Sequence, residues 1–266
     1  MAASLLSKKS VYVVTGASRG LGRTIVLELS KNVLPGSVFV LLARNDVLLN
    51  EVAALIRQGD KIRAVTAVFD QSSSNQDALN NLLNSCLLKA EVAPNEFEQA
   101  VLINNAGSLE PLEFVRDQDN IAEISAHFQM NLVGYLAITS KFLQLFKSTV
   151  VDSRVVVNIS SLAAISPMKS WGPYCMAKAG RDMMIKVLAS EEEKIRALSY
   201  APGPLPTDML DIASEKTKDG ELKQWFHDQL SQKTLVECVD SAKKLIAILE
   251  KNAFENGAHI DYYDDI

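Results

Sequence analysis

A tyrosine and a lysine stand four residues apart in the stretch WGPYCMAKAG, residues 171–180. In a helix, Tyr174 and Lys178 lie on one face, one turn apart. A free phenol has a pKa of about 10, so Tyr174 is a poor proton donor unless its phenolate is stabilised. One ammonium charge about 4 Å away contributes about 4 kcal/mol at an effective dielectric near 20, which is enough to bring that pKa to about 7. We therefore expect Lys178 to tune Tyr174 as a general acid; an ordinary helix surface is the alternative.

A glycine-rich stretch, TGASRGLG, follows the first apolar run of the chain. Gly16, Gly20 and Gly22 permit a tight turn and let backbone N–H groups approach a pyrophosphate at a helix N-terminus. The spacing G-x-x-x-G-x-G is wider than the usual dinucleotide fingerprint, but its place between a strand and a helix favours a dinucleotide site. A glycine turn with no ligand is the alternative. The predicted loop contacts are Gly16, Ala17, Ser18, Arg19, Gly20, Leu21 and Gly22.

The end of the second apolar run indicates which cofactor binds. An NAD site has an acidic residue there, whereas this chain has Ala43 and Arg44. The Arg44 guanidinium can hold a 2′-phosphate through a forked hydrogen bond, and Arg19 can assist, so we expect NADP(H) rather than NAD(H). A solvated surface cation is the alternative for Arg44. We expect Asp70 to accept from the adenine amino group. The other predicted cofactor contacts are Asn45, Asp70, Gln71, Asn105, Lys178, Leu205, Pro206, Thr207, Asp208 and Met209.

Apolar runs alternate with helical patterns along the chain. The apolar runs cover 11–15, 37–43, 62–69, 100–104, 154–160, 195–201 and 258–263, and the helical patterns cover 22–32, 50–58, 76–90, 118–147, 173–193 and 240–251. Continuous apolar runs are typical of parallel strands that are covered on both faces. Repeated βαβ units then predict an α/β, doubly wound, Rossmann-like fold with a single domain over residues 1–266. The long polar segment 204–236 is interpreted as a substrate flap; a plain surface insertion is equally consistent with it.

Charge and composition argue against several classes of protein. The net charge is −5 and no block of basic residues occurs, which argues against nucleic acid and anionic membranes as partners. The three cysteines form no CxxC motif and the three histidines lack metal-ligand spacing, so we expect reduced thiols and no metal site. Without a signal-peptide pattern or an 18-residue apolar stretch, a cytoplasmic protein is expected.

Taken together, TGxxxGxG, NNAG, the Asn of FQMNLVG, S-x12-Y-x3-K and YAPG resemble the short-chain dehydrogenase/reductase family over nearly the whole chain. The resemblance implies a carbonyl reductase in which Ser161 holds the substrate oxygen and Tyr174 supplies the proton. It also implies that Lys178 holds the nicotinamide ribose and that Asn131 holds a water linking Lys178 to solvent. Family members commonly pair through the helices that would lie near 118–147 and 173–193, so a homodimer is expected.

The ending GAHIDYYD resembles the family members that reduce pterin side-chain carbonyls with NADPH, late in tetrahydrobiopterin synthesis. The resemblance implies that the Asp261 carboxylate accepts from the amino group and the ring N–H of a pterin. The implied substrate contacts are Ser161, Leu162, Tyr174, Gly203 and Asp261. Two alternatives stay open, a reductase with a broader range of carbonyl substrates and a non-catalytic NADPH-binding regulator. The presence of Asn131, Ser161, Tyr174 and Lys178 together argues against the regulator.

Overall fold

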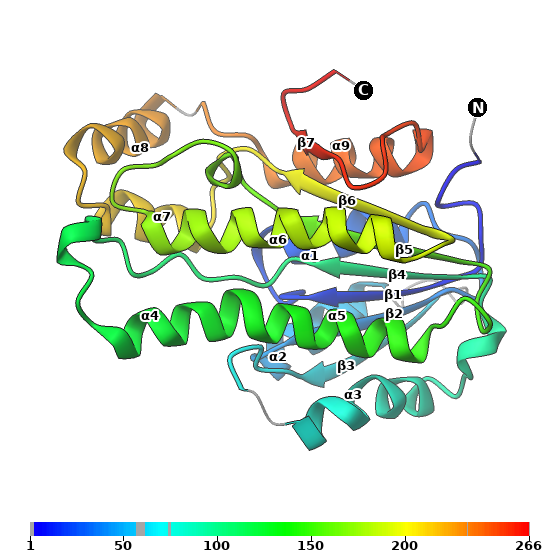
Figure 1. Cartoon of the computed structure of the whole chain (residues 1–266). Coiled ribbons are helices and arrows are strands. Elements are labelled where there is room, and N and C mark those ends of the chain that lie inside the picture. The colour runs from blue at the N-terminus through cyan, green and yellow to red at the C-terminus, as the bar shows by residue number, and fades with distance from the viewer. Residues whose placement is uncertain (1–2, 57–61, 74–75, 233, 266) are drawn as a thin grey trace.

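The computed structural model describes residues 3–56, 62–73, 76–232 and 234–265. These residues build one parallel sheet of seven strands in the order β3-β2-β1-β4-β5-β6-β7 (Figure 1). The strands are β1 (Ser10–Thr15), β2 (Val38–Ala43), β3 (Arg63–Val68), β4 (Gln99–Asn104), β5 (Ser153–Ile159), β6 (Ile195–Ala201) and β7 (His259–Asp261). Each predicted apolar run is a strand, so the prediction of a doubly wound parallel sheet is confirmed.

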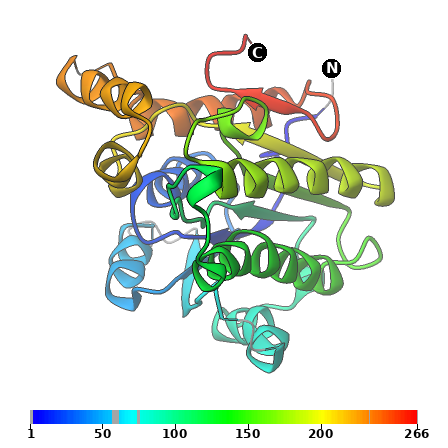
Figure 2. The same cartoon turned by 60° about the vertical axis from the view of Figure 1, so that its left-hand side comes forward.

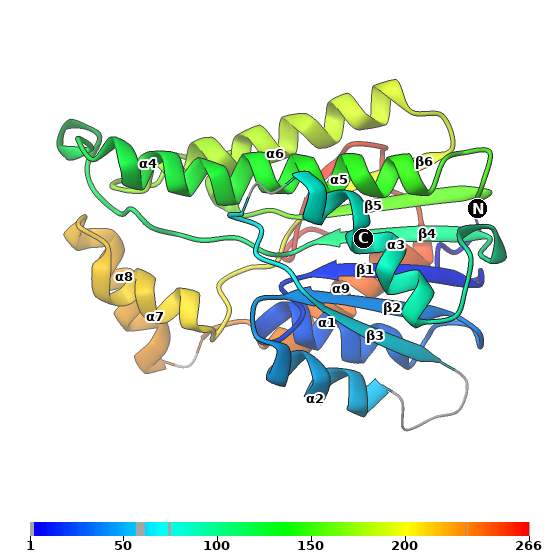
Figure 3. The same cartoon turned by 90° about the horizontal axis from the view of Figure 1, so that it is seen from below.

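Helices cover both faces of the sheet, as the continuous apolar runs require. They are α1 (Gly20–Ser30), α2 (Asp46–Ile56), α3 (Gln76–Lys89), α4 (Ile121–Phe128), α5 (Gly134–Leu145), α6 (Gly172–Glu191), α7 (Asp208–Lys216), α8 (Gly220–Gln232) and α9 (Cys238–Lys251). Seen from below, α4, α5 and α6 lie on one side of the sheet, and α1, α2 and α9 on the other (Figure 3). The result is a three-layer arrangement.

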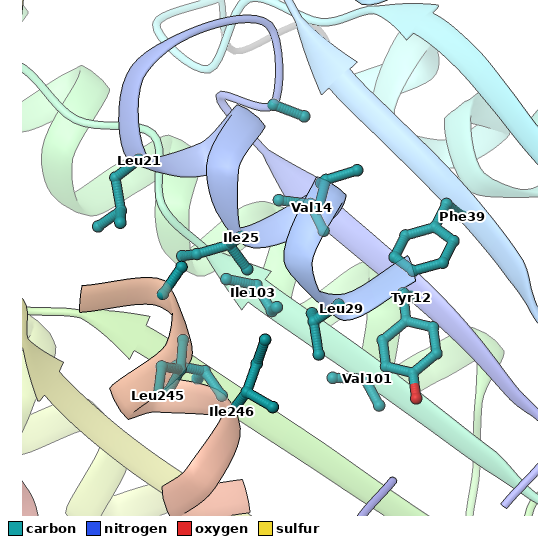
Figure 4. Close-up of a cluster of buried hydrophobic side chains, with 14 of the residues drawn as sticks. Tyr12, Val14, Leu21, Ile25, Leu29, Phe39, Val101, Ile103, Leu245 and Ile246 are labelled. Carbon is teal, nitrogen blue, oxygen red and sulfur yellow. The ribbon is translucent and has the colours of Figure 1, made fainter. Parts of the chain in front are cut away.

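Two apolar clusters hold these layers together, one on each face. Tyr12 and Val14 of β1 belong to the cluster under α1, α2 and α9, whereas Val11 and Val13 belong to the cluster under α3, α5 and α6. Successive strand side chains point to opposite faces, which explains the division. In the first cluster the rings of Tyr12 and Phe39 stack with centroids 4.9 Å apart (Figure 4). Full burial of one apolar side chain of this size stabilises the fold by about 1.5–3 kcal/mol relative to exposure. The two clusters therefore hold the central strands in place between the helical layers.

Some helix and strand boundaries differ from those predicted. The helix expected over 118–147 is divided by a π-helical turn, Gln129–Val133, between α4 and α5. At Gly134 an added Cβ would lie 1.8 Å from the backbone oxygen of Gln71, so only glycine allows this close approach. The strand expected over 258–263 is limited to β7. The helix expected over 50–58 begins earlier, at Asp46, and its predicted residues 57 and 58 lie outside the described residues.

The segment 204–236 is not an extended loop, because α7 and α8 occupy most of it. Both helices stand at the carboxyl ends of the strands, and Figure 2 brings this end of the molecule forward. Residue 233 of the segment is outside the described residues. Within the described part of the chain, no helix has the length and apolar character that crossing a membrane requires. No group of three His, Cys, Asp or Glu side chains suited to a metal ion occurs among the same residues.

Candidate active site

One large cleft opens at the carboxyl ends of the strands. It has a volume of about 1420 Å³ and is bounded by the glycine loop, the ends of β4, β5 and β6, and helices α7 and α8. Pockets for a single small ligand have volumes of about 300–1,000 Å³, so the cleft has room for a cofactor together with a substrate. The predicted residues on its walls are Gly16, Ser18, Arg19, Gly20, Leu21, Arg44, Asn45, Gln71, Asn105, Ser161, Leu162, Tyr174, Lys178, Gly203, Leu205, Thr207, Asp208, Met209 and Asp261.

Five predicted site residues do not line this cleft: Ala17, Gly22, Asp70, Asn131 and Pro206. Ala17 is fully buried beneath the glycine loop. An added Cβ on Gly22 would lie 2.3 Å from the backbone oxygen of Gly16, so Gly22 lets α1 pack closely against the turn. The Asp70 carboxylate accepts from both the backbone N–H and the hydroxyl of Ser72. These contacts support the walls of the cleft, and the cofactor contacts expected of Ala17, Gly22 and Asp70 stay predictions.

The glycine loop has the features of an anion site. Gly16 has a φ of +67° and Gly20 a φ of +53°, a backbone conformation that favours glycine. The side-chain amide of Asn105 donates to the backbone oxygens of Thr15 at 3.1 Å and Gly16 at 3.2 Å, which holds the turn in shape. No side chain caps the first turn of α1 and no acidic residue lies in it. The free N–H groups and the positive end of the helix dipole therefore suit a phosphate group.

Arg44 and Arg19 occupy different surroundings in the cleft. Arg44 is exposed on the wall after β2, and Ala43 and Arg44 occupy the positions where an NAD site has its acid; Asp46, at the beginning of α2, lines the same cleft. Arg19 forms an exposed ion pair with Asp208 at the beginning of α7, from the opposite side of the cleft. Arg44 thus lies where the sequence predicts a cation for a 2′-phosphate, and its role in cofactor selectivity stays a prediction. The assistance expected from Arg19 requires this surface ion pair to open, which costs little.

Tyr174, Lys178 and Ser161 meet at the inner end of the cleft, as the motif predicts. The Nζ atom of Lys178 donates to the backbone oxygen of Ile159 at 2.6 Å and lies 5.5 Å from the centre of the Tyr174 ring. Tyr174 and Lys178 are each only 5% exposed to solvent. Helix α6 therefore places the pair side by side on its buried face, directly under the end of β5.

The expected lowering of the Tyr174 pKa is wrong for the protein chain by itself. Burial raises the pKa of Tyr174 to about 12, although the Ser161 hydroxyl and the positive charge of Arg181 both act to lower it. Burial likewise lowers the pKa of Lys178 well below its ordinary value, and the nearby Arg181 adds to this effect. The cost of desolvating both charged forms exceeds the attraction that the simple charge pair predicts. Tyr174 is therefore a fully protonated acid at neutral pH.

Asn131 lies in the π-helical turn and is buried behind the cleft. Its side-chain amide donates to the backbone oxygen and the hydroxyl of Ser108, both at 3.0 Å, and its Oδ1 accepts from the Ser108 backbone at 3.1 Å. The same Oδ1 accepts from the Arg181 guanidinium at 3.3 Å. Asn131 thus joins the π-helical turn to the loop after β4 and to α6, and the water-holding role implied by the family stays a prediction.

Arg181 is a buried charge that the sequence reasoning missed. It is 0% exposed, and its guanidinium donates to the backbone oxygens of Asn131 at 2.5 Å and Ala106 at 3.1 Å. The guanidinium also lies 4.5 Å from the centre of the Tyr135 ring. Arg181 stands three residues after Lys178 and therefore on the same helix face, a spacing from which its place near the Tyr174–Lys178 pair could have been predicted. Arg181 supplies a positive charge that favours the Tyr174 phenolate, the part expected of Lys178.

Aromatic side chains from the 204–236 segment close one side of the cleft. Phe226 of α8 stacks on Trp171 with ring centroids 5.4 Å apart, and Trp171 meets Tyr174 edge to face at 5.5 Å. Trp225 also lines the cleft and is 43% exposed. The segment therefore forms the cleft wall next to Trp171 and Tyr174, and its role as a substrate flap stays a prediction.

Asp261 stands at the other side of the substrate region. It is the last residue of β7 and pairs with Ala201 of β6. One carboxylate oxygen, Oδ1, accepts from the Tyr263 backbone at 3.1 Å, and the residue is half-buried on the cleft wall. Gly203, with a φ of +78°, brings the turn after β6 to the same wall. The structure therefore brings Asp261 into one cleft with Ser161 and Tyr174.

Comparison with known proteins gives concordant matches. A family model described as short chain dehydrogenase matches residues 10–218. Sepiapterin reductase of Meriones unguiculatus is 41% identical over 96% of this chain and 97% of its own length. Benzil reductase ((S)-benzoin forming) of Bacillus subtilis is 29% identical over 94% of this chain and 97% of its own length. A solved short chain dehydrogenase/reductase from Saccharomyces cerevisiae is similar with a TM-score of 0.76 and 26% identity, covering 96% of each chain.

Proposed function

This chain belongs to the short-chain dehydrogenase family, and we propose that it uses NADPH to reduce the side-chain ketones of pterins such as sepiapterin, in the final steps of tetrahydrobiopterin synthesis. One observation carries the choice of substrate: Asp261, a half-buried carboxylate, lines the same cleft as Ser161 and Tyr174. The relative that is 41% identical over almost its entire length and is named sepiapterin reductase supports this choice.

The residues present fit a bound NADPH. The uncapped first turn of α1 and the open glycine loop suit the pyrophosphate, and Arg44 suits the 2′-phosphate. Lys178, at the inner end of the cleft, would hold the nicotinamide ribose. When bound there, the cofactor supplies a hydride to the carbonyl carbon, and the protein provides orientation and electrostatics.

The protein's own part in the reaction is to place and protonate the carbonyl oxygen. The Ser161 hydroxyl would donate to that oxygen and hold it beside the Tyr174 hydroxyl. Because burial raises the Tyr174 pKa to about 12, the phenol carries its proton throughout the neutral range. As the oxygen gains negative charge, Tyr174 gives up this proton, and Ser161 together with the buried Arg181 charge stabilises the resulting phenolate.

Asp261 would determine which carbonyl compounds bind well. The pyrimidinone edge of a pterin presents an amino group and a ring N–H side by side, and both are donors. A carboxylate can accept from both in a forked pair. Because Oδ1 already accepts from the Tyr263 backbone, its second lone pair and Oδ2 would serve this edge. The ring would then extend toward Ser161 and Tyr174 with its side-chain carbonyl leading.

A broader carbonyl reductase is the second candidate. The aromatic wall of Trp171, Trp225 and Phe226 favours flat, apolar substrates in general. The Bacillus relative is named for the reduction of benzil. Oxidation of NADPH by the purified protein with sepiapterin and with benzil separates the two. A kcat/KM that is much higher for sepiapterin supports the pterin reductase, and equal values favour the broader enzyme.

We also propose that two copies associate and that the protein acts in the cytoplasm. An exposed apolar face lies on α5, on the π-helical turn before it and on α6. Its side chains are apolar, so covering them would be favourable. The members are Val133, Leu136, Met176, Met183 and Val187. Figure 3 shows α5 and α6 side by side on the outer surface of one helical layer. A second copy of the chain would cover this face.

A further inference from the structure

A buried carboxylate lies behind the cleft and joins three different parts of the fold: its own helix α6, the end of β5 and strand β7. Asp182 of α6 is 7% exposed. Its Oδ1 accepts from the Ser160 hydroxyl at 2.6 Å and from the Asn158 side-chain amide at 3.0 Å. Its Oδ2 accepts from Nδ1 of His259 at 2.6 Å. Burial acts to raise the pKa of Asp182, but the hydrogen bonds from His259, Ser160 and Ser199 lower it, so the carboxylate is charged.

Each of the three parts carries at least one residue of the proposed site. Ser160 directly precedes Ser161 at the end of β5. Asp182 itself lies one helical turn after Lys178 and two turns after Tyr174 on α6. His259 lies two residues before Asp261 on β7. Because residues i and i+2 of a strand point to the same face, His259 and Asp261 lie on one face of β7.

Strand β7 needs such an anchor, because it is short and lies at the edge of the sheet. It has three residues and pairs only with β6 among the described strands. The backbone bonds at its two ends are Ser199 to Ala258 at 2.9 Å and Tyr262 to Ala201 at 2.8 Å. Short edge segments with few bonds open more readily than central strands. The His259 imidazole, hydrogen-bonded to Asp182, therefore adds a side-chain contact to the few backbone bonds that hold β7 against the body of the protein.

We propose that Asp182 and His259 are positioning residues, which fix β7 so that Asp261 holds the substrate ring at the right distance from Ser161 and Tyr174. The inference rests on the proposed function, because it assumes that Asp261 binds the substrate. It predicts that loss of the Asp182–His259 contact weakens the binding of substrates that use Asp261. Proton transfer to a substrate without such an edge continues, because Ser161 and Tyr174 stay in place.

A direct role for His259 is the competing explanation. His259 lines the cleft, and its Nε2 atom is buried and has no hydrogen-bond partner in the described structure. Substitution of His259 by asparagine or by glutamine separates the two explanations, because the side-chain amide of each places a nitrogen near one of the two ring nitrogens. An asparagine at this position places its amide nitrogen near that of Nδ1 and keeps the bond to Asp182. A glutamine reaches the place of Nε2 but loses the short contact.

The test compares His259→Asn and His259→Gln with the unmodified protein. We expect His259→Asn to keep kcat/KM for sepiapterin within about threefold, and His259→Gln to lose about tenfold or more, mainly through KM, since a hydrogen bond to a charged group is lost. Both variants should reduce benzil within about threefold of the unmodified protein. The reverse order of the two variants, equal losses in both, equal losses on both substrates, or no loss would each overturn the proposal.

Hydrogen exchange of peptides covering residues 257–265 provides a measurement that needs no turnover. We expect faster exchange in His259→Gln than in His259→Asn or the unmodified protein, with NADPH and substrate both left out. Unchanged exchange would contradict the positioning role even if activity falls. Should His259→Gln fail to fold, His259→Ala carries the same expectation. If the unmodified protein does not reduce sepiapterin, the proposed function fails, while the exchange measurement still decides whether Asp182 anchors β7.

Discussion

The ammonium group of Lys178 lies 5.5 Å from the centre of the Tyr174 ring and donates its hydrogen bond to the backbone oxygen of Ile159. The two residues thus share one buried face of α6, but the lysine is held by the end of β5. Burial raises the Tyr174 pKa to about 12, and the positive charge that opposes this rise is that of Arg181. The spacing Y-x3-K therefore places the phenol and the amine on one buried face, whereas the groups that lower the Tyr174 pKa are the Ser161 hydroxyl and the Arg181 charge farther along the helix.

Removal of the Tyr174 hydroxyl should abolish most of the turnover. We expect Tyr174→Phe to lower kcat for sepiapterin about 10²–10⁴-fold, the usual contribution of general acid catalysis. NADPH binding should change little, because the ring keeps its edge-to-face contact with Trp171. Steady-state kinetics and a fluorescence titration with NADPH measure the two effects. Turnover equal to that of the unmodified protein would show that another group donates the proton.

Reversal of the charge at Arg44 should change the cofactor preference. Arg44→Asp removes the cation that would hold the 2′-phosphate and adds an acid that repels it. The kcat/KM for NADPH should therefore fall, and the ratio of kcat/KM for NADH to that for NADPH should rise. Arg116→Asp is the matched control, because Arg116 is an exposed arginine that does not line the cleft. An unchanged ratio of the two cofactors in Arg44→Asp would remove Arg44 from the cofactor site.

The buried Asp182 should make stability depend on acid pH. Its pKa is lowered from the ordinary value of 3.8, so its charged form stabilises the fold above that value, and this contribution is lost as the pH falls through the lowered pKa. We therefore expect the difference in free energy of unfolding between the unmodified protein and Asp182→Asn to be largest at neutral pH and to shrink in acid. Urea unfolding at several pH values measures it. A difference that is constant with pH would contradict a charged, hydrogen-bonded Asp182.

A charge on the apolar face of α5 and α6 should separate the two copies of the proposed dimer. Leu136 is 54% exposed on α5, and we expect Leu136→Glu to convert a dimer to a monomer in analytical ultracentrifugation. Leu88→Glu is the control, since Leu88 is 77% exposed on α3 and does not belong to this face. A monomeric unmodified protein, or a dimer that tolerates Leu136→Glu, would contradict the proposed interface.

The fold could be predicted from sequence because its signals are local. Continuous apolar runs indicate buried parallel strands, and a glycine loop between a strand and a helix indicates an anion site. The division of the 118–147 helix was missed, because a π-helical turn leaves the apolar spacing almost unchanged and arises from contacts with Gln71 and Arg181. The end of β7 was also missed, because it is decided by the pairing of β7 with β6, a contact between distant parts of the chain that no local pattern contains.

The site was predictable where motif order brings residues to one sheet edge, as with Ser161 and Tyr174. The pKa of Tyr174 was not, because desolvation depends on every atom that excludes water from the phenol, and no spacing rule contains this information. Arg181 and Asp182 were missed because a charged residue after a motif is most often solvated. Only the packing of α6 against β5 and the π-helical turn shows that both are buried.

Asp261 provides the most direct test of the central claim, that the cleft is built for a pterin ketone. The measurement is kcat/KM for sepiapterin and for benzil, with NADPH, in the unmodified protein and in Asp261→Ala. Asp265→Ala is the control, because Asp265 is an exposed acid in the same tail that does not line the cleft. Loss of a charged hydrogen-bond acceptor should lower the sepiapterin value about tenfold to a hundredfold, leaving benzil and the Asp265→Ala protein nearly unchanged. Equal losses for sepiapterin and benzil in Asp261→Ala, or no loss for sepiapterin, would contradict the account and favour the broader carbonyl reductase.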